Sequence, residues 1–245
     1  MSDPVFLVDG LDSPAMGDTV TLAGDEGRHA VVVRRIRVGE RVVLTDGRGL
    51  GVEGTVTAVA NTFLQLTVDK VRHVPEPAVR YVVGQAVAKG DRAELAVEML
   101  TEVGVDEILP WSASRSIVRW SADRAARGLA RWRSTAREAT KQSRRLRAPL
   151  VGEPVSTTAL AKRIAQADLA LVLHEEATEP LSAVALPPAG TVLIIVGPEG
   201  GIAPMELDTF VVAGAHPVSI SDGVLRTSTA GAVAVALLRA CGVRP

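Results

Sequence analysis

The chain has few cysteine and aromatic residues, and each shortage excludes a class of protein. Its single cysteine, Cys241, excludes an internal disulfide framework and a cysteine-rich zinc site. Aromatic residues make up 3% of the 245 residues, so a base-stacking platform of the RRM kind is not expected. The four histidines lack the spacing of metal ligands, and we expect no metal.

Long hydrophobic runs and a secretory signal are also lacking. No apolar run reaches the roughly 18 residues that suggest a membrane span, and the N-terminus has early acidic residues with no basic region. Hydrophobic residues nevertheless make up 47% of the chain, enough to offset chain entropy, which excludes a disordered protein. We expect a soluble, cytoplasmic protein with no membrane partner.

Charge is distributed unevenly along the chain. The net charge is −1, but the segment 113–149 contains eleven basic residues and two acidic ones. Sixteen basic and twenty-six acidic residues remain for the rest of the chain. Ten of the eleven are arginines, which suit bidentate phosphate contacts and stacking on bases. A solvated helix face would mix signs, because like charges one turn apart repel. The segment therefore favours nucleic-acid contact.

Residues 1–74 have the pattern of a small β-rich domain. Short strands are predicted at 5–8, 19–22, 41–46, 52–60 and 62–71, with one helical segment at 26–35. Short strands with glycine-bearing turns and one helix suggest a small barrel. The segment HVPEPAV, with two prolines, then predicts a linker.

Residues 75–245 have the pattern of an α/β fold. Strands are predicted at 79–87, 107–111, 169–173, 191–196 and 217–220, and helices at 91–103, 121–141, 157–166, 205–213 and 227–240. Continuous apolar strands alternating with helices predict a parallel sheet covered on both faces. Asp91 and Glu94 are expected to form a capping box at the first of these helices, and Gly104 to end it.

Three loops follow predicted strands, where open parallel sheets bind their ligands. They begin at His174, Gly197 and Ser221. The second, GPEGG, has three glycines that let backbone approach a ligand closely, and a carboxylate, Glu199, that a tight turn does not need. It is neither a G-x-G-x-x-G fingerprint nor a Walker loop, so dinucleotide or ATP binding is not indicated. An ordinary tight turn is the alternative.

The third loop places a cation, Arg226, just before a helix N-terminus. A positive charge there is poorly placed for the helix dipole, so something else should balance it. The alternatives are a structural pair with Glu199 or Asp222, a phosphate, or an anion that develops during a reaction.

Two of these loops carry a resemblance to a known family. GPEGG followed by SISDGVLRTSTAGAVAVALL is similar to the paired C-terminal motifs of the SPOUT methyltransferases, and among them to the RsmE-type 16S ribosomal RNA uridine-N3 methyltransferases. GRHAVVVRRIRVGERV, KGDRAELAVEMLTEVGVDEILP and REATKQSRRLRAP agree as well. The resemblance covers most of the chain. The chain departs from the family at Ser228, where glutamate is usual, and at Ile220-Ser221, where Leu-Gly is usual.

The resemblance implies a fold, a cofactor and partners. It implies a PUA-like RNA-binding β-barrel in residues 1–74 and a SPOUT α/β domain with a deep trefoil knot in residues 75–245. It further implies a homodimer that binds S-adenosylmethionine (SAM) in the knot and methylates N3 of a uridine in 16S ribosomal RNA, in the naked RNA or in the small ribosomal subunit.

Candidate site residues follow from the loops and the resemblance. SAM carries no phosphate, so its site needs backbone groups and an apolar slot. The expected cofactor-binding residues are Leu173, Gly197, Glu199, Gly201, Ile220 and Leu225. As uracil N3 loses its proton, charge spreads to the carbonyl oxygens, and a cation would stabilise it. Arg226 is the first candidate for this role and Arg144 the second, while Glu199 is a candidate general base.

Basic residues are the expected RNA contacts, with a solvated helix end as the alternative for those in the first domain. The expected RNA-binding residues are Arg28, Arg34, Arg35, Arg115, Gln142, Arg144 and Arg145, of which Gln142 is a candidate for the uracil edge. Two other functions stay open: methylation of another RNA position, such as a ribose 2′-hydroxyl, and a catalytically silent RNA-binding protein.

Overall fold

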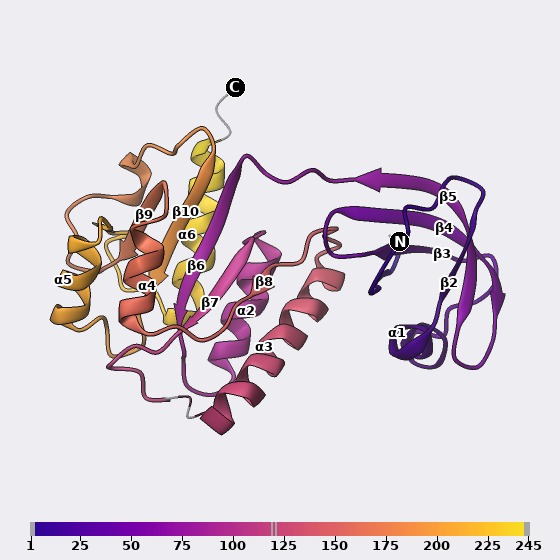
Figure 1. The fold of residues 1–245 in the computed structure, drawn as a ribbon, viewed down its shortest axis with the longest axis horizontal. Helices are drawn as coiled ribbons and strands as arrows, with labels where there is room; N and C mark the ends of the chain where they lie inside the picture. Colours follow the sequence, from indigo (N-terminus) through magenta and orange to yellow (C-terminus); the bar gives the residue numbers. More distant parts are fainter. Residues whose placement is uncertain (1–2, 119, 121, 243–245) are drawn as a thin grey trace. The chain divides into compact units, whose positions relative to one another are not determined.

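The computed structural model describes residues 3–118, 120 and 122–242, which form two compact units (Figure 1). Unit 1 comprises Met1–Glu76 and Thr140–Ala148, and unit 2 comprises Pro77–Ala139 and Pro149–Pro245.

Unit 1 is built on a five-stranded sheet. Its strands are β1 (Val5–Leu7), β2 (Thr19–Leu22), β3 (Arg41–Thr45), β4 (Leu50–Val59) and β5 (Leu64–His73), in the order β1-β3-β4-β5-β2. The alternation along β4 points Val52 and Val56 into a core shared with Leu44 and Leu66. The predicted β-rich domain is confirmed. The single predicted helix is instead α1 (Gly24–Arg28) followed by the π-helical turn η1 (His29–Val33).

A distant segment, Thr140–Ala148, completes unit 1. Gly49 N donates to Leu146 O at 2.8 Å, which joins the turn before β4 to this segment. Lys141 Nζ lies 3.0 Å from Glu26 Oε1, and both side chains are largely buried. These contacts explain why residues so far along the chain fold with the N-terminal strands.

Unit 2 contains a six-stranded sheet in which every neighbouring pair is parallel, as predicted. Its strands are β6 (Val79–Ala86), β7 (Glu107–Trp111), β8 (Leu150–Val151), β9 (Leu169–Leu173), β10 (Gly190–Val196) and β11 (His216–Val218), in the order β11-β9-β10-β6-β7-β8. The two-residue β8 was not predicted, because so short a strand has no periodicity to recognise.

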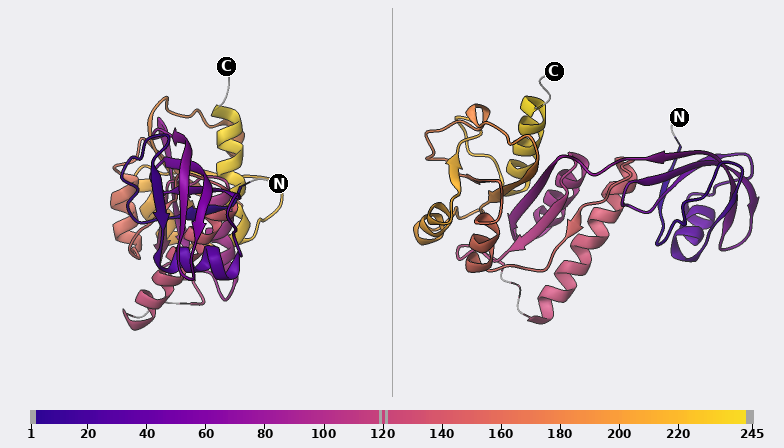
Figure 2. Two further views of the ribbon diagram at one scale, coloured as in Figure 1. Left: turned by 90° about the vertical axis from the view of Figure 1, so that its right-hand side faces the viewer. Right: turned by 45° about the horizontal axis from the view of Figure 1, so that its top comes forward.

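Helices cover both faces of this sheet (Figures 1 and 2). Along β10, Val192 and Ile194 face one core and Leu193 and Ile195 face the other, as the two-residue period of a strand requires. The first core contains residues of α2 (Arg92–Glu102), α3 (Ala122–Gln142) and α6 (Thr227–Gly242), and the second contains residues of α4 (Thr157–Ile164) and α5 (Pro204–Val212). The 3₁₀ turn η2 (Leu181–Ala183) packs on the first core.

The expected capping box of helix α2 is wrong. Asp91 has φ −63° and ψ −10°, a helical conformation, and its side chain makes no capping hydrogen bond. A capping side chain needs an extended backbone to reach the first N–H groups. The helix ends as predicted, with Gly104 in the left-handed region at φ +88°.

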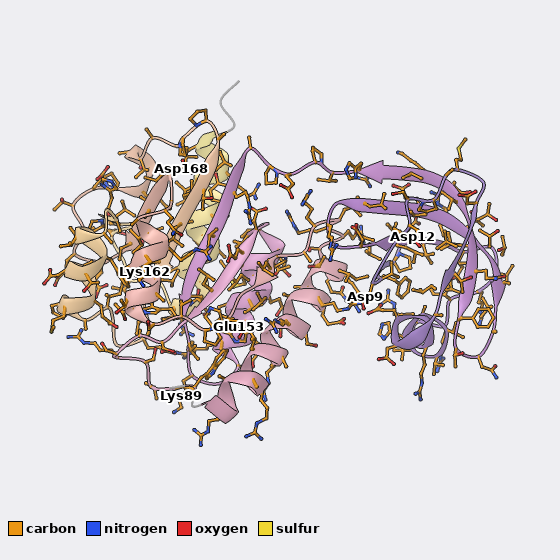
Figure 3. The ribbon with its side chains drawn as sticks, in the orientation of Figure 1. Asp9, Asp12, Lys89, Glu153, Lys162 and Asp168 are labelled. Carbon is orange, nitrogen blue, oxygen red and sulfur yellow. The ribbon has the colours of Figure 1, made fainter. Side chains whose placement is uncertain are left out.

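Two residues labelled in Figure 3 mark the opposite ends of the parallel strands in unit 2. Lys89 follows the carboxyl end of β6, whereas Asp168 precedes the amino end of β9. In the part of the chain that the structure describes, no helix is long and apolar enough to cross a membrane. The same residues contain no cluster of three or more potential metal ligands.

Candidate functional site

A cavity of about 310 Å³ lies at the carboxyl ends of the parallel strands in unit 2. The loops after β9, β10 and β11 line it, as does Arg92 at the start of α2. Ser219 N donates to Glu179 O at 2.9 Å, and Thr227 Oγ1 donates to Gly197 O at 3.0 Å. The loop after β11 is therefore bonded to both of the other loops, and the three form one wall.

All six expected cofactor-binding residues and Arg226 lie on this cavity. They are Leu173, Gly197, Glu199, Gly201, Ile220, Leu225 and Arg226. The loops after three strands thus contribute apolar side chains, backbone groups and two charged side chains, those of Glu199 and Arg226, to one slot. Such a volume is at the lower end of the range for small-molecule sites in proteins.

The GPEGG loop requires glycine at two of its positions. Gly201 has φ +71°, a conformation that side chains rarely adopt. A Cβ on Gly197 would lie 2.7 Å from Ile202 Cγ1, inside van der Waals contact. Glycine therefore serves both the turn and the close packing of the cavity wall.

Arg226 is exposed and directly precedes α6, where its carbonyl accepts from Thr229 N and Ala230 N. Within the described ranges, no salt bridge joins Arg226 to Glu199 or Asp222. Glu199 Oε1 instead accepts from the backbone N–H of Lys89 at 3.1 Å. Arg226 therefore lines the cavity next to the positive end of a helix, and no described carboxylate forms a salt bridge with it.

Several lining residues were not predicted. They include Arg92, His174, Glu175 and Val224. Arg92 lies after the carboxyl end of β6. The sequence analysis considered only the loops after three other strands, although the rule that ligands bind at the carboxyl ends of strands applies to β6 as well. His174 Nδ1 accepts from Glu176 N at 3.2 Å, so the neutral ring carries its proton on Nε2.

Arg115 lies beside the GPEGG loop. Its Nη1 donates to Gly200 O at 3.3 Å and to Ile202 O at 3.5 Å, and the side chain is otherwise exposed. Of the expected RNA-binding residues, Arg115 is the one that belongs to unit 2.

The other expected RNA-binding residues belong to unit 1. Those with exposed side chains are Arg28, Arg34, Arg35, Gln142 and Arg144, whereas Arg145 is half-buried. Arg35 and Arg144 both have φ +55°, so each ends its local turn in the left-handed region.

Part of the basic segment serves the fold of unit 2. Arg131 pairs with Glu94 at 3.2 Å, and Arg133 pairs with Glu153 at 2.9 Å. Arg119 lies outside the described residues. The positive charge of Arg131 and Arg133, both exposed, is therefore partly balanced within unit 2.

Comparison with protein families gives two matches along the chain. Residues 75–239 match the RNA methyltransferase domain, and residues 22–69 match the RNA methyltransferase PUA domain. A curated relative, Ribosomal RNA small subunit methyltransferase E from Mycobacterium bovis, is 44% identical over 94% of this chain and 89% of its own length.

Two solved structures resemble nearly the whole chain. A methyltransferase from Legionella pneumophila, in complex with the bound cofactor SAM, has a TM-score of 0.87 and 26% identity over 98% of each chain. A Ribosomal RNA small subunit methyltransferase E from Neisseria gonorrhoeae, bound to S-adenosyl methionine, has a TM-score of 0.85 and 26% identity over 98% of each chain.

Proposed function

The chain belongs to the family of RNA methyltransferases with a PUA domain, and on that premise we propose that it methylates ribosomal RNA of the small subunit with SAM as donor. The finer proposal is that the target is N3 of a uridine in 16S ribosomal RNA. The observation that carries the proposal is the cavity at the strand ends, where three loops place all six residues expected to hold SAM.

The residues of the cavity fit the chemistry of SAM. The donor has a sulfonium, an ammonium and a carboxylate but no phosphate, and the described residues that line the cavity include two arginines, Arg92 and Arg226, but no lysine. Leu173, Ile220 and Leu225 offer apolar surface, while Glu175 and Glu199 offer negative charge for the cationic groups. When bound, SAM supplies the methyl group.

Two side chains of the wall are proposed to act on the base. Glu199 Oε1 accepts a hydrogen bond from Lys89 N, whereas Oε2 accepts none from a described residue. Glu199 Oε2 is therefore proposed to accept the N3 proton. The guanidinium of Arg226 stabilises the negative charge that then spreads to the uracil oxygens. Both roles need a base turned out of its helix, because N3 is otherwise paired.

RNA binding is proposed for the exposed basic residues. Arg115 of unit 2 and, independently, Gln142 and Arg144 of unit 1 are proposed to contact the RNA, and Arg144 is kept as the second candidate for charge stabilisation. Arg28, Arg34, Arg35 and Arg145 extend the phosphate contacts. We propose residues 1–74 as the RNA-binding domain and 75–245 as the methyltransferase domain, with Thr140–Ala148 folding as part of the first unit; the matches to residues 22–69 and 75–239 support this division.

The trefoil knot and the homodimer remain proposals. The knot is supported by the segment after β11, which is hydrogen-bonded to the loop after β9 at Ser219 and to the loop after β10 at Thr227. A partner protomer is proposed because the family resemblance implies one. A small-subunit RNA substrate implies the cytoplasm as the place of action.

The decisive experiment maps methylated nucleotides by mass spectrometry in ribosomal RNA from a deletion strain. Loss of one N3-methyluridine in 16S RNA, restored by the purified protein and SAM, is the expected result. Loss of a ribose methyl group would change the target. An unaltered RNA, together with no SAM binding in calorimetry, would leave only an RNA-binding protein.

A further inference from the structure

Glu206 is a buried carboxylate whose oxygens are both fully used. It is the third residue of α5 and is 7% exposed. Oε1 accepts from Ser114 N and Thr157 Oγ1, each at 2.9 Å. Oε2 accepts from Ser114 Oγ at 2.9 Å and from Ala203 N at 3.3 Å. A carboxylate has about four lone-pair positions, so these donors fill them.

The four donors come from three separate segments of unit 2. They are the turn 112–116 after β7, the start of α4, and the loop 197–203 after β10. One turn further along α5, Phe210 packs edge-to-face on Trp111 at the end of β7, with ring centroids 5.2 Å apart. Trp111 Nε1 also donates to Thr157 Oγ1 at 3.3 Å. Helix α5 thus holds the end of β7 by a polar and an apolar contact.

The turn 112–116 and the loop 197–203 also touch directly. Arg115 follows Ser114 and donates to two carbonyls of the loop. A Cβ on Gly200 would lie 3.2 Å from Arg115 O, so the two backbones are close. Five residues of this loop line the cavity, while Glu206 itself does not. Any effect of Glu206 on the cavity must therefore act through the loop.

We propose that Glu206 is a positioning residue that fixes the turn 112–116 to the loop 197–203. The donor-binding backbone and the Arg115 guanidinium are thereby held in one arrangement. This inference rests on the proposed function, in which the loop binds SAM and Arg115 contacts RNA. It adds a residue that touches neither ligand but determines the geometry offered to both.

The substitution Glu206→Gln tests this role because it keeps size and shape. Each carboxylate oxygen accepts from one hydroxyl and one backbone N–H, so either orientation of the amide turns its NH₂ group toward a backbone N–H, of Ser114 or of Ala203, that cannot accept. The turn or the loop must then move to relieve the contact. The matched control is Glu107→Gln on β7, because Glu107 is also 7% exposed but pairs with Arg163 at 2.7 Å and does not line the cavity.

Affinity, hydrogen-exchange and steady-state kinetic measurements compare the variants. SAM affinity is measured by calorimetry, and backbone hydrogen exchange is measured by mass spectrometry without ligand. We expect Glu206→Gln to raise the Kd for SAM about tenfold, to raise KM for SAM more than it lowers kcat, and to speed exchange in 112–116 and 197–203 together. Glu107→Gln should lower Tm and leave the SAM affinity and these exchange rates unchanged.

Equal SAM affinity and equal exchange in the two variants would overturn the proposal. If Glu206→Gln does not fold, Ser114→Ala removes a single donor from an exposed residue and should still raise the Kd two- to threefold. No change in that variant would also count against the proposal. A wild-type protein that binds no SAM would refute the proposed function instead, and the exchange comparison would still decide the positioning role.

Discussion

Replacing Arg226 by alanine should separate stability from activity. The side chain is exposed and has no ion pair among the described residues, so the substitution breaks no salt bridge in the part of the chain that the structure describes. It also removes a positive charge from the N-terminus of α6, where a cation is unfavourable by about 0.3–1 kcal/mol. We therefore expect the free energy of unfolding to stay constant or to rise by a few tenths of a kcal/mol.

The effect on turnover should have the opposite sign. A cation or donor aimed at developing negative charge contributes about 3–4 kcal/mol to catalysis, which is roughly a 100- to 1000-fold change in rate. Arg226→Lys keeps the charge but loses the planar fork, so it should recover part of this loss. SAM affinity should change little, because the groups proposed to hold the donor are Glu175, Glu199, the backbone and the apolar side chains of the cavity, and Arg226 is assigned to the base.

The assay is transfer of a radiolabelled methyl group from SAM to small subunits from a deletion strain, under single-turnover conditions. Arg80→Ala serves as the control, because Arg80 is exposed at the amino end of β6 and does not line the cavity. An Arg226→Ala rate within about threefold of the wild-type rate would refute the assigned role. So would a loss of activity that parallels a loss of folded protein.

Four further outcomes are expected. Gly201→Ala should destabilise the protein by about 1 kcal/mol and weaken SAM binding, because φ +71° strains any side chain; an unchanged urea midpoint would contradict this. Lys141→Met should cost about 3 kcal/mol in urea unfolding, because it breaks the largely buried ion pair between Lys141 and Glu26, whereas exposed Lys162→Met should cost little. Burial raises the pKa of Tyr81, the only tyrosine, so the folded state keeps that proton to higher pH than the unfolded chain. The resulting stability is complete below about pH 10 and is lost as pH rises through the folded pKa, a loss that Tyr81→Phe should abolish. RNA affinity should fall steeply between low and moderate salt, and a flat response would argue against phosphate contacts.

The sequence was most informative where a residue's role depends on its neighbours in the chain. Buried strands such as β9 and β10 have continuous apolar runs, and the rule that ligands bind at strand ends led directly to Gly197, Gly201 and Arg226. Predictions from residue type and spacing failed where the backbone conformation differed from the expected one. Asp91 has a side chain that can cap a helix, but its backbone is helical, and the residue types around it do not indicate this.

The interactions that could not be predicted from the sequence join residues that are far apart along the chain. A glutamate in the first turn of a helix is common, because its negative charge is favourable near the positive end of the helix dipole. Two of the residues that donate to Glu206, Ser114 and Thr157, however, lie 92 and 49 residues away in the sequence. Arg131 and Arg133 likewise pair with carboxylates from other elements, Glu94 and Glu153. Local patterns do not encode such pairings, because the fold creates them.

The assignment of Thr140–Ala148 to unit 1 has a consequence for how the protein is made. During translation the N-terminal strands leave the ribosome long before this segment is synthesised. Lys141 and Leu146, the partners of Glu26 and Gly49, are then still missing, so a nascent chain ending near residue 76 has no native arrangement for those groups. The first unit to begin folding therefore finishes only after much of the second has emerged, and a fragment cut at the apparent linker should be less stable than the same strands in the complete protein.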